Sequence, residues 1–343
     1  MHCGRFGFSI FDNRTTGKIQ RIGGYRLNTP KTLKNVRKGL FSFARAVILI
    51  EIGFIVLYPV IYMLSMAFRP VEQVYNPNVI WVPLSLTMEN ITRVWEFMDF
   101  PKAAWNTVYL DVLSAIMQTV ICCIVAYGFA RFNFRGRNLL FTMVIFTIIV
   151  PPSTTLISSY LQYRSFDFAY IFSSINWIFT GNFEGVRLVD TPMVMWLPAL
   201  FGMGIRSGLF IFLYRQYFMG MPKELEEAAY IDGCNSLSCF TKIIVPNAKS
   251  EIVTVFIFSV VWYYNDTFFS TTYMDSLRTI STSLEYLNEN LATLSPLGAV
   301  MDRFQVVTLV QAACLLVIAP LTIFYIIMQR SFTESITNSG IVG

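Results

Sequence analysis

The chain has 343 residues, of which 55% are apolar and only 14% are charged, with a formal net charge of +5. A soluble domain of this length needs more polar surface, because about a quarter of the residues in an average soluble protein are charged. The composition therefore excludes an ordinary soluble protein and indicates an integral membrane protein.

Six charge-poor runs come close to the roughly 20 residues that a helix needs to cross a bilayer. They are Val47–Phe68, Val112–Ala130, Asn138–Tyr163, Thr191–Tyr214, Ile252–Met274 and Phe304–Gln329. Glu51 and Pro59 weaken the first run, Arg206 interrupts the fourth, and Asp266 lies towards the end of the fifth. Tyr170–Thr180 is too short and too polar for a seventh span, and we interpret it as an outer loop or interfacial turn. The runs predict an all-α membrane protein with six transmembrane helices.

The orientation follows from Lys and Arg, which cytoplasmic loops retain. Residues 1–45 carry ten of the 26 Lys and Arg, and six spans place about 18 inside against seven outside. We therefore expect a basic cytoplasmic arm at 1–45, a membrane domain at 46–330 with a cytoplasmic loop at 219–247, and a cytoplasmic tail at 331–343. The arm fits an orientation signal or an anionic-lipid contact rather than a nucleic-acid site. No cleavable signal precedes the first span, which is itself the targeting element.

Metal and nucleotide motifs are missing from the sequence. The six cysteines include no CxxC pair, His2 is the sole histidine, and no GxxxxGK[ST] run occurs. The run "GMGIRSG" at 202–208 lacks the dinucleotide glycine spacing and falls in a predicted span, where small residues let helices approach closely. We expect this chain to bind no cofactor and no metal.

The stretch "PKELEEAAYIDGC" between the fourth and fifth spans has the signals of a short helix of about ten residues. Pro222 suits a first helical position, three glutamates favour the positive end of the helix dipole, and Gly233 suits a left-handed cap. A narrow face of small side chains follows helical spacing: Leu225, Ala228, Ala229 and Asp232. The pattern fits either an ordinary surface helix or a helix that docks on a partner.

The next residues, "NSLSCFTKIIVPNA", predict a second short helix, and the two together predict a helical hairpin. Ser236 can cap this helix, and Pro246 is expected to break it just before the fifth span. Its predicted apolar face consists of Leu237, Phe240, Ile243 and Ile244. Short rigid helices of this kind can pass a partner's motion to a membrane bundle.

The run "ELEEAAYIDG…KIIVP" resembles the signature of the inner-membrane permease subunits of binding-protein-dependent ATP-binding-cassette importers. That signature reads Glu-Ala-Ala, three residues, Gly, nine residues, then Ile-x-Leu-Pro, and Val245 replaces its leucine. The matching positions are Glu227, Ala228, Ala229, Gly233, Ile243 and Pro246. The runs "SLTMENITRVW", "AYGFARFNFRGR", "GLFIFLYRQYF" and "QRSFTESITNSGIVG" resemble the carbohydrate-uptake branch of the family.

This resemblance implies a type I importer permease fold in a bacterial inner membrane, with both termini cytoplasmic. The hairpin would be the coupling helix that sits in a groove of an ATPase subunit, and a tail such as Gln329–Gly343 would reach the ATPase interface. The implied coupling residues are Glu226, Glu227, Ala228, Ala229, Asp232, Gly233, Ile243 and Pro246. The implied partners are a second permease, two ATPase subunits that hold ATP and Mg²⁺, and a solute-binding protein that delivers a carbohydrate, with an oligosaccharide as first choice. The chain itself would catalyse nothing.

Arg206, Trp262 and Tyr263 are candidates for the translocation path, because an arginine can donate to a substrate and flat rings suit sugars. An ionised side chain inside the bilayer costs at least about 2.5–3.5 kcal/mol unless it faces protein or water. Arg206 can equally serve a structural pair with Asp190 or Asp266, or an interface with the companion permease. Aromatic residues are common in membrane helices, so Trp262 and Tyr263 also have an ordinary structural explanation.

Two other classes of function remain open at this point. An ion-coupled secondary transporter could use Glu51, Arg206 and Asp266 as coupling charges, but the halves show no obvious repeat and such a carrier does not need a docking hairpin. A membrane-embedded enzyme needs a cluster of acids, bases or metal ligands, which a chain with one histidine does not favour.

Overall fold

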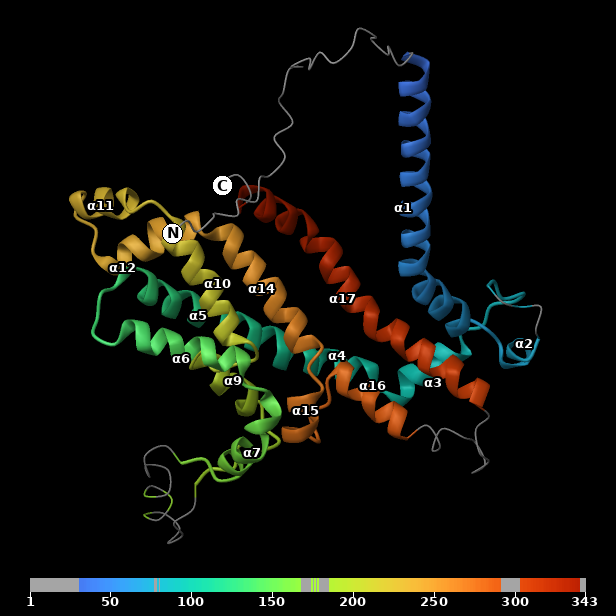
Figure 1. Ribbon diagram of the computed structural model, residues 1–343. Coiled ribbons are helices and arrows are strands. Elements are labelled where there is room, and N and C mark those ends of the chain that lie inside the picture. Colours follow the sequence, from blue (N-terminus) through green and yellow to red (C-terminus); the bar gives the residue numbers. More distant parts are fainter. Residues whose placement is uncertain are drawn as a thin grey trace, which may run out of the picture. The chain divides into compact units, whose positions relative to one another are not determined.

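The computed structural model describes residues 31–76, 79, 81–167, 174, 176, 178, 185–290 and 303–339, most of which are helical (Figure 1). Among them, β pairing is limited to an isolated antiparallel bridge between Phe166 and Val186. The contacts divide the chain into two compact units, Met1–Pro59 and Val60–Gly343. Most of the predicted outer segment Tyr170–Thr180, the arm before residue 31 and the last four residues of the tail lie outside the described residues.

The described helices follow one another along the chain with short connections. They are α1 (Lys31–Ala67), α2 (Val71–Val74), α3 (Glu89–Phe97), α4 (Phe100–Thr107), the π-helical η1 (Val108–Val112), α5 (Leu113–Arg131), α6 (Arg137–Ile149), η2 (Pro152–Thr154), α7 (Leu156–Arg164), α9 (Met193–Leu200), α10 (Ser207–Gly220), α11 (Glu224–Ile231), α12 (Ser236–Cys239), the π-helical η3 (Phe240–Ile244), α13 (Val245–Asn247), α14 (Lys249–Tyr264), α15 (Phe268–Tyr273), α16 (Ile280–Glu289) and α17 (Arg303–Ser339). Part of the predicted tail is therefore helical.

Within the described residues, three helices are long and apolar enough to cross a membrane: Gly39–Ala67, Phe100–Arg131 and Gln305–Arg330. A fourth candidate is the bent pair Ser236–Asn247 and Lys249–Tyr264, whose axes differ by 77°. The third predicted span is interrupted, because α6 ends before Pro151 and Pro152, and a residue that precedes proline disfavours the α conformation. The structure thus gives unbroken helices for the first, second and sixth predicted spans.

The fourth predicted span is broken between α9 and α10. Gly202 and Arg206 have positive φ angles of 68° and 60°, which a continuous helix does not allow. The break is held from α5, where the Gln118 side-chain amide donates to the Ile205 carbonyl at 2.6 Å. A Cβ atom at Gly204 would contact the Tyr263 hydroxyl and lie 2.7 Å from the Gln118 Oε1 atom, so only glycine fits there.

The core of the unit that starts at Val60 is built around α5 and α10, which pack along each other. Tyr214, Phe210 and Phe218 of α10 are completely buried, and the ring of Tyr127 from α5 meets Phe218 edge-on. Gly208 lets α10 approach α6, because a Cβ atom there would lie 3.0 Å from the Val144 carbonyl oxygen. The expectation that glycines in the 202–208 run permit close helix approach is confirmed at this position.

Candidate functional site

Helix α11 contains the acidic residues predicted for its first turn and ends in a glycine cap. Gly233 has φ +81°, and its N–H donates to the Tyr230 carbonyl at 3.1 Å. The Cys234 N–H donates to the Ala229 carbonyl at 3.0 Å, which completes a Schellman motif. A Cβ atom at Gly233 would meet nothing within 4 Å, so the backbone angle alone calls for glycine. The predicted left-handed cap is confirmed, although the helix begins two residues after Pro222.

The exposed face of α11 differs from the predicted small-sided face. Leu225 and Ala228 are exposed, but Ala229 is buried in the core with Cys239 and Ile244. Ile231 is 86% exposed at the carboxyl end of the helix. The outward surface is therefore more apolar and less flat than the sequence indicates, and Ala229 instead anchors the helix.

A buried ion pair attaches α11 to the end of α5. The Arg131 Nε atom lies 2.6 Å from the Glu226 Oε1 atom, and the two side chains are only 6% and 11% exposed. Arg131 also donates from Nη2 to the Met221 carbonyl at 2.9 Å. Glu226 therefore faces the protein interior, whereas Glu227 is exposed. One arginine at the end of a long membrane helix thus fixes both the start and the inner face of α11.

The second arm of the hairpin runs through α12, η3 and α13 and bends at Ala248 before α14. Asn235, rather than Ser236, caps it, because the Asn235 side-chain oxygen accepts from the Ser238 N–H at 2.8 Å. Pro246 lies inside α13 and does not end the arm, which is a correction to the expected break. Of the predicted apolar face, Ile244 is fully buried whereas Leu237 is 72% exposed.

Arg206 and Trp262 come together in the structure at the break before α10. The Arg206 guanidinium carbon lies 4.6 Å from the centre of the Trp262 ring, and both side chains are exposed. Tyr263 points the other way and is buried against the break. Two of the three residues proposed for the path therefore share one surface, and the third supports the backbone behind it.

The predicted acidic partners of Arg206 are engaged elsewhere. Asp190 accepts from the backbone N–H groups of Asp275 and Ser276 at 3.0 and 2.9 Å. Asp266 accepts from the start of α15, including the N–H and hydroxyl of Ser270 at 3.0 and 2.9 Å. Within the described residues, no ion pair joins Arg206 to either carboxylate, so the structural explanation by such a pair is not supported.

Two polar residues of the second span were missed by sequence reasoning. Asp111 lies in the π-helical turn η1, fully buried, and its carboxyl oxygens have no hydrogen-bond partner among the described residues. Gln118 holds the α9–α10 break. The predicted span began at Val112, whereas the helix begins at Phe100, so Asp111 fell outside the predicted membrane segment. A polar residue flanking an apolar run was the only available signal.

The described part of the chain contains no group of three or more His, Cys, Asp or Glu side chains that could hold a metal ion. The five described cysteines are free, and three of them, Cys122, Cys123 and Cys239, are buried. The chemistry of the site consists of hydrogen bonds, ion pairs and apolar contacts.

Comparison with known proteins identifies the architecture. The family model of the binding-protein-dependent transport system inner membrane component matches residues 118–338. The arabinooligosaccharides transport system permease protein of Halalkalibacterium halodurans is 26% identical over 85% of this chain and 93% of that protein. The osmoprotective compounds uptake permease protein of Synechocystis is 30% identical over 66% of this chain and 70% of that protein. The sn-glycerol-3-phosphate transport system permease protein of Escherichia coli is 23% identical over 88% and 98%.

Among solved structures, a chain of a bacterial ABC transporter involved in the import of the acidic polysaccharide alginate matches with a TM-score of 0.66 and 22% identity, over 86% of this chain and 98% of that chain. This likeness shows a shared fold. Because the family model covers well over half of the sequence, the chain belongs to the inner-membrane components of binding-protein-dependent transport systems.

Proposed function

We propose that this chain is one of two permease subunits of an ATP-binding-cassette importer, in which the hairpin of α11–α13 docks in a groove of an ATPase subunit. The observation that carries this proposal is an exposed apolar surface on a rigid mount. Leu225, Ile231 and Leu237 face outward. The buried Arg131–Glu226 pair and the Gly233 cap fix the hairpin beneath them. A flexible loop could not transmit a displacement in this way.

Six spans and cytoplasmic termini fit the family and the helices together. In this proposal the spans are α1, α4–α5, α6–α7, α9–α10, α14–α15 and α17, with the breaks in the third and fourth spans lying inside the bundle. Irregular backbone is tolerated at membrane depth where protein buries it or a water-filled cavity lines it. The excess of Lys and Arg in residues 1–45 places the amino terminus and the hairpin on the cytoplasmic side.

The substrate is a carbohydrate or a related polyol compound, delivered by a solute-binding protein on the outer side. The names of the arabinooligosaccharide and glycerol-phosphate relatives support this class. Arg206 and Trp262 face the translocation path, where the guanidinium donates to substrate oxygens and the indole ring holds it in place. The second permease, probed by the exposed faces of the bundle, closes the other half of the path.

ATP binding and hydrolysis take place on the partner ATPases, so this chain has no catalytic residue and no bound cofactor. ATP-driven closure of the two ATPases moves both docking hairpins and shifts the permease pair towards the state that opens outward. Hydrolysis and release of the ATPase pair restore the inward-open state.

The proposal is tested by co-purification of the tagged chain from its own membrane in mild detergent. Ile231→Glu places a charge on the outward surface of α11 without disturbing the core, because Ile231 is 86% exposed. Leu84→Glu is the matched control, since Leu84 is 79% exposed in a segment outside the hairpin. We expect wild type and Leu84→Glu to carry an ATPase and a second permease, and Ile231→Glu to lose the ATPase. Equal recovery of the ATPase with Ile231→Glu would show that the hairpin is not the docking element.

A further inference from the structure

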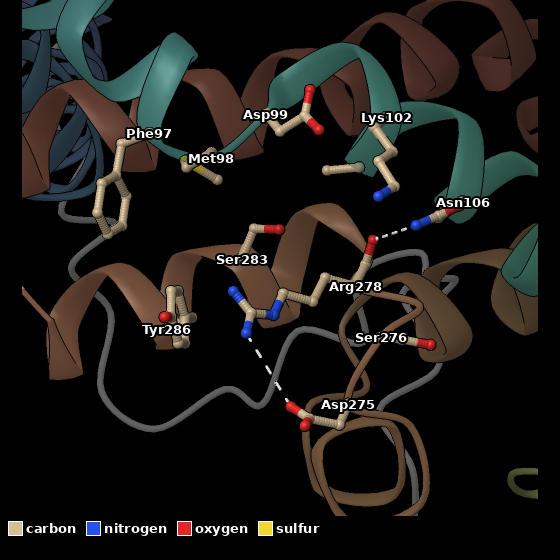
Figure 2. Close-up of a pocket in the computed structure, with 11 residues that line it drawn as sticks. Phe97, Met98, Asp99, Lys102, Asn106, Asp275, Ser276, Arg278, Ser283 and Tyr286 are labelled. Atoms are coloured by element: carbon tan, nitrogen blue, oxygen red, sulfur yellow. Dashed lines mark hydrogen bonds and ion pairs between the residues drawn. The ribbon is translucent and has the colours of Figure 1, made fainter. Parts of the chain in front are cut away.

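A polar pocket of about 220 Å³ lies between the α3–α4 junction and the loop that leads into α16 (Figure 2). Asp99, Lys102 and Asn106 line it from the α4 side, and Arg278, Ser283 and Tyr286 line it from the α16 side. All of these residues belong to the unit that begins at Val60. The pocket plays no part in the hairpin or in the Arg206–Trp262 surface.

The pocket is built on an anchored loop. Asn106 donates from its side-chain amide to the Arg278 carbonyl at 2.8 Å, and the Thr107 hydroxyl accepts from the Ile280 N–H at 2.9 Å. Thr279 caps α16 through a reciprocal capping box with Thr282. Pre-organised polar groups lose little conformational entropy when a ligand binds, so this loop is suited to ligand binding.

The Arg278 guanidinium is held as a fixed donor. Its carbon atom lies 3.5 Å from the centre of the Tyr286 ring, whose other neighbour is the stacked ring of Phe97. The ion pair with Asp275 is weak, because its atoms are 4.0 Å apart and the Asp275 side chain is 99% exposed. The guanidinium therefore keeps N–H groups for a ligand, since arginine has five donors in a fixed plane.

A buried hydroxyl in the pocket wall has no partner. Ser283 is 3% exposed, lines the pocket, and its Oγ atom has no hydrogen-bond partner among the described residues. Figure 2 shows this hydroxyl between Asp99 and the Arg278 guanidinium in the drawn view. Buried polar atoms are normally satisfied, so an orphan that lines a cavity points to a ligand or water that completes it.

We propose that this pocket is a subsite for one ring of a neutral saccharide at the outer mouth of the permease. Two cationic side chains, Lys102 and Arg278, are balanced by two carboxylates, Asp99 and Asp275, so the lining has no net charge to favour an anion. Donors and acceptors alternate around it, as a ring that carries several hydroxyls requires. Its volume is below the roughly 300–1,000 Å³ of sites for drug-sized ligands, which suits one ring rather than a whole oligosaccharide.

The position of the pocket follows from the long helix Phe100–Arg131. Lys102 and Asn106 lie in its first turns, and Arg131, which holds the docking hairpin, is its last residue. A helix of 32 residues is about 48 Å long, more than the roughly 40–45 Å of a bilayer with its headgroups. The subsite and the hairpin therefore lie on opposite sides of the membrane. This placement of the subsite outside rests on the proposed function, which puts the hairpin in the cytoplasm.

The test uses the complete transporter in membrane nanodiscs and measures protection of a single cysteine. Lys102→Cys is exposed and lines the pocket, so a polar maleimide reagent can reach it, and mass spectrometry of the labelled peptide separates it from native cysteines. Arabinotriose and maltotriose are the neutral probes, and inorganic phosphate and galacturonate are the anionic ones. At ten times the Kd of a bound trisaccharide, labelling should slow by about tenfold.

Thr271→Cys is the matched control, because Thr271 is exposed on α15 but does not line the pocket. Its labelling should not change, and adding Arg278→Ala to Lys102→Cys should abolish the protection. Protection by the anions and not by the trisaccharides would overturn the neutral class, and no protection by any probe would overturn the subsite. Recovery of the ATPase in the same preparation tests the proposed function separately, so an intact complex without protection refutes the subsite alone.

Discussion

Replacing Arg131 by methionine should loosen the hairpin specifically. The substitution keeps an apolar stem but leaves Glu226, whose side chain is 11% exposed, without its cation. Removing one partner of a buried ion pair costs about 3–5 kcal/mol, because the remaining charge is left unpaired. The hydrogen bond to the Met221 carbonyl is lost as well. Since about 1.4 kcal/mol is a factor of ten, opening of α11 should become at least about a hundredfold more frequent.

Hydrogen exchange measured by mass spectrometry on peptides that cover 221–234 reports this opening. In Arg131→Met these peptides should exchange faster, while peptides from α17 keep their wild-type rates. In the assembled transporter, ATP hydrolysis should continue while uptake falls, because a loosely mounted hairpin transmits less displacement to α5. Arg135→Met is the control, since Arg135 is exposed nearby and removes the same charge.

The double variant Arg131→Met/Glu226→Met separates the ion pair from general packing. Replacing both members of a buried pair by apolar residues is often neutral or stabilising. The double variant should therefore recover slow exchange at 221–234. If it exchanged as fast as Arg131→Met alone, the unpaired charge would not be the cause, and the reasoning from the buried pair would be refuted.

Three further substitutions test other parts of the structure. Gly233→Ala forces an alanine to φ +81°, which costs about 1–2 kcal/mol, and should speed exchange of the α11 peptides; an unchanged rate would exclude a strained cap. Gly204→Ala should lower the thermal midpoint of the complex by overpacking against Tyr263, at about 1–3 kcal/mol, and a neutral result would contradict the close approach. Partial burial acts to raise the pKa of Asp190, but donors from Ser276 and Asp275 hold that pKa below its ordinary value of 3.8. Its stabilisation of the 275–276 backbone is therefore present at neutral pH and is lost as the pH falls through the lowered pKa. Asp190→Asn should speed exchange of these amides at pH 7 by the loss of a charged acceptor worth about 1.5–3 kcal/mol, and wild-type rates there would contradict it.

Local signals in the sequence predicted local features of the fold well. The glycine cap at Gly233 and the acidic first turn of α11 depend on a few consecutive residues, and the structure has both. The choice of Asn235 over Ser236 as the cap of the second arm shows the limit, because both residue types can cap a helix and adjacent positions compete.

Features that join distant parts of the chain could not be predicted. Arg131 contributed only to the orientation argument, because nothing in the sequence brings it to Glu226, 95 residues later. The break before α10 is likewise held by Gln118 from another span, and a hydropathy run does not distinguish a continuous helix from two short ones. Pairing between spans is decided by three-dimensional packing, so it requires the structure.

The continuous helix from Phe100 to Arg131 connects the two ends of the proposed transport cycle. Its first turns contribute Lys102 and Asn106 to the outer pocket, its middle holds the α9–α10 break through Gln118, and its last residue fixes α11. A displacement of the hairpin therefore reaches the break and the pocket through a single element, without passing through a flexible connection. This physical route makes a definite claim, because a variant that weakens only the Arg131 attachment should disturb the outer side while leaving ATPase docking intact.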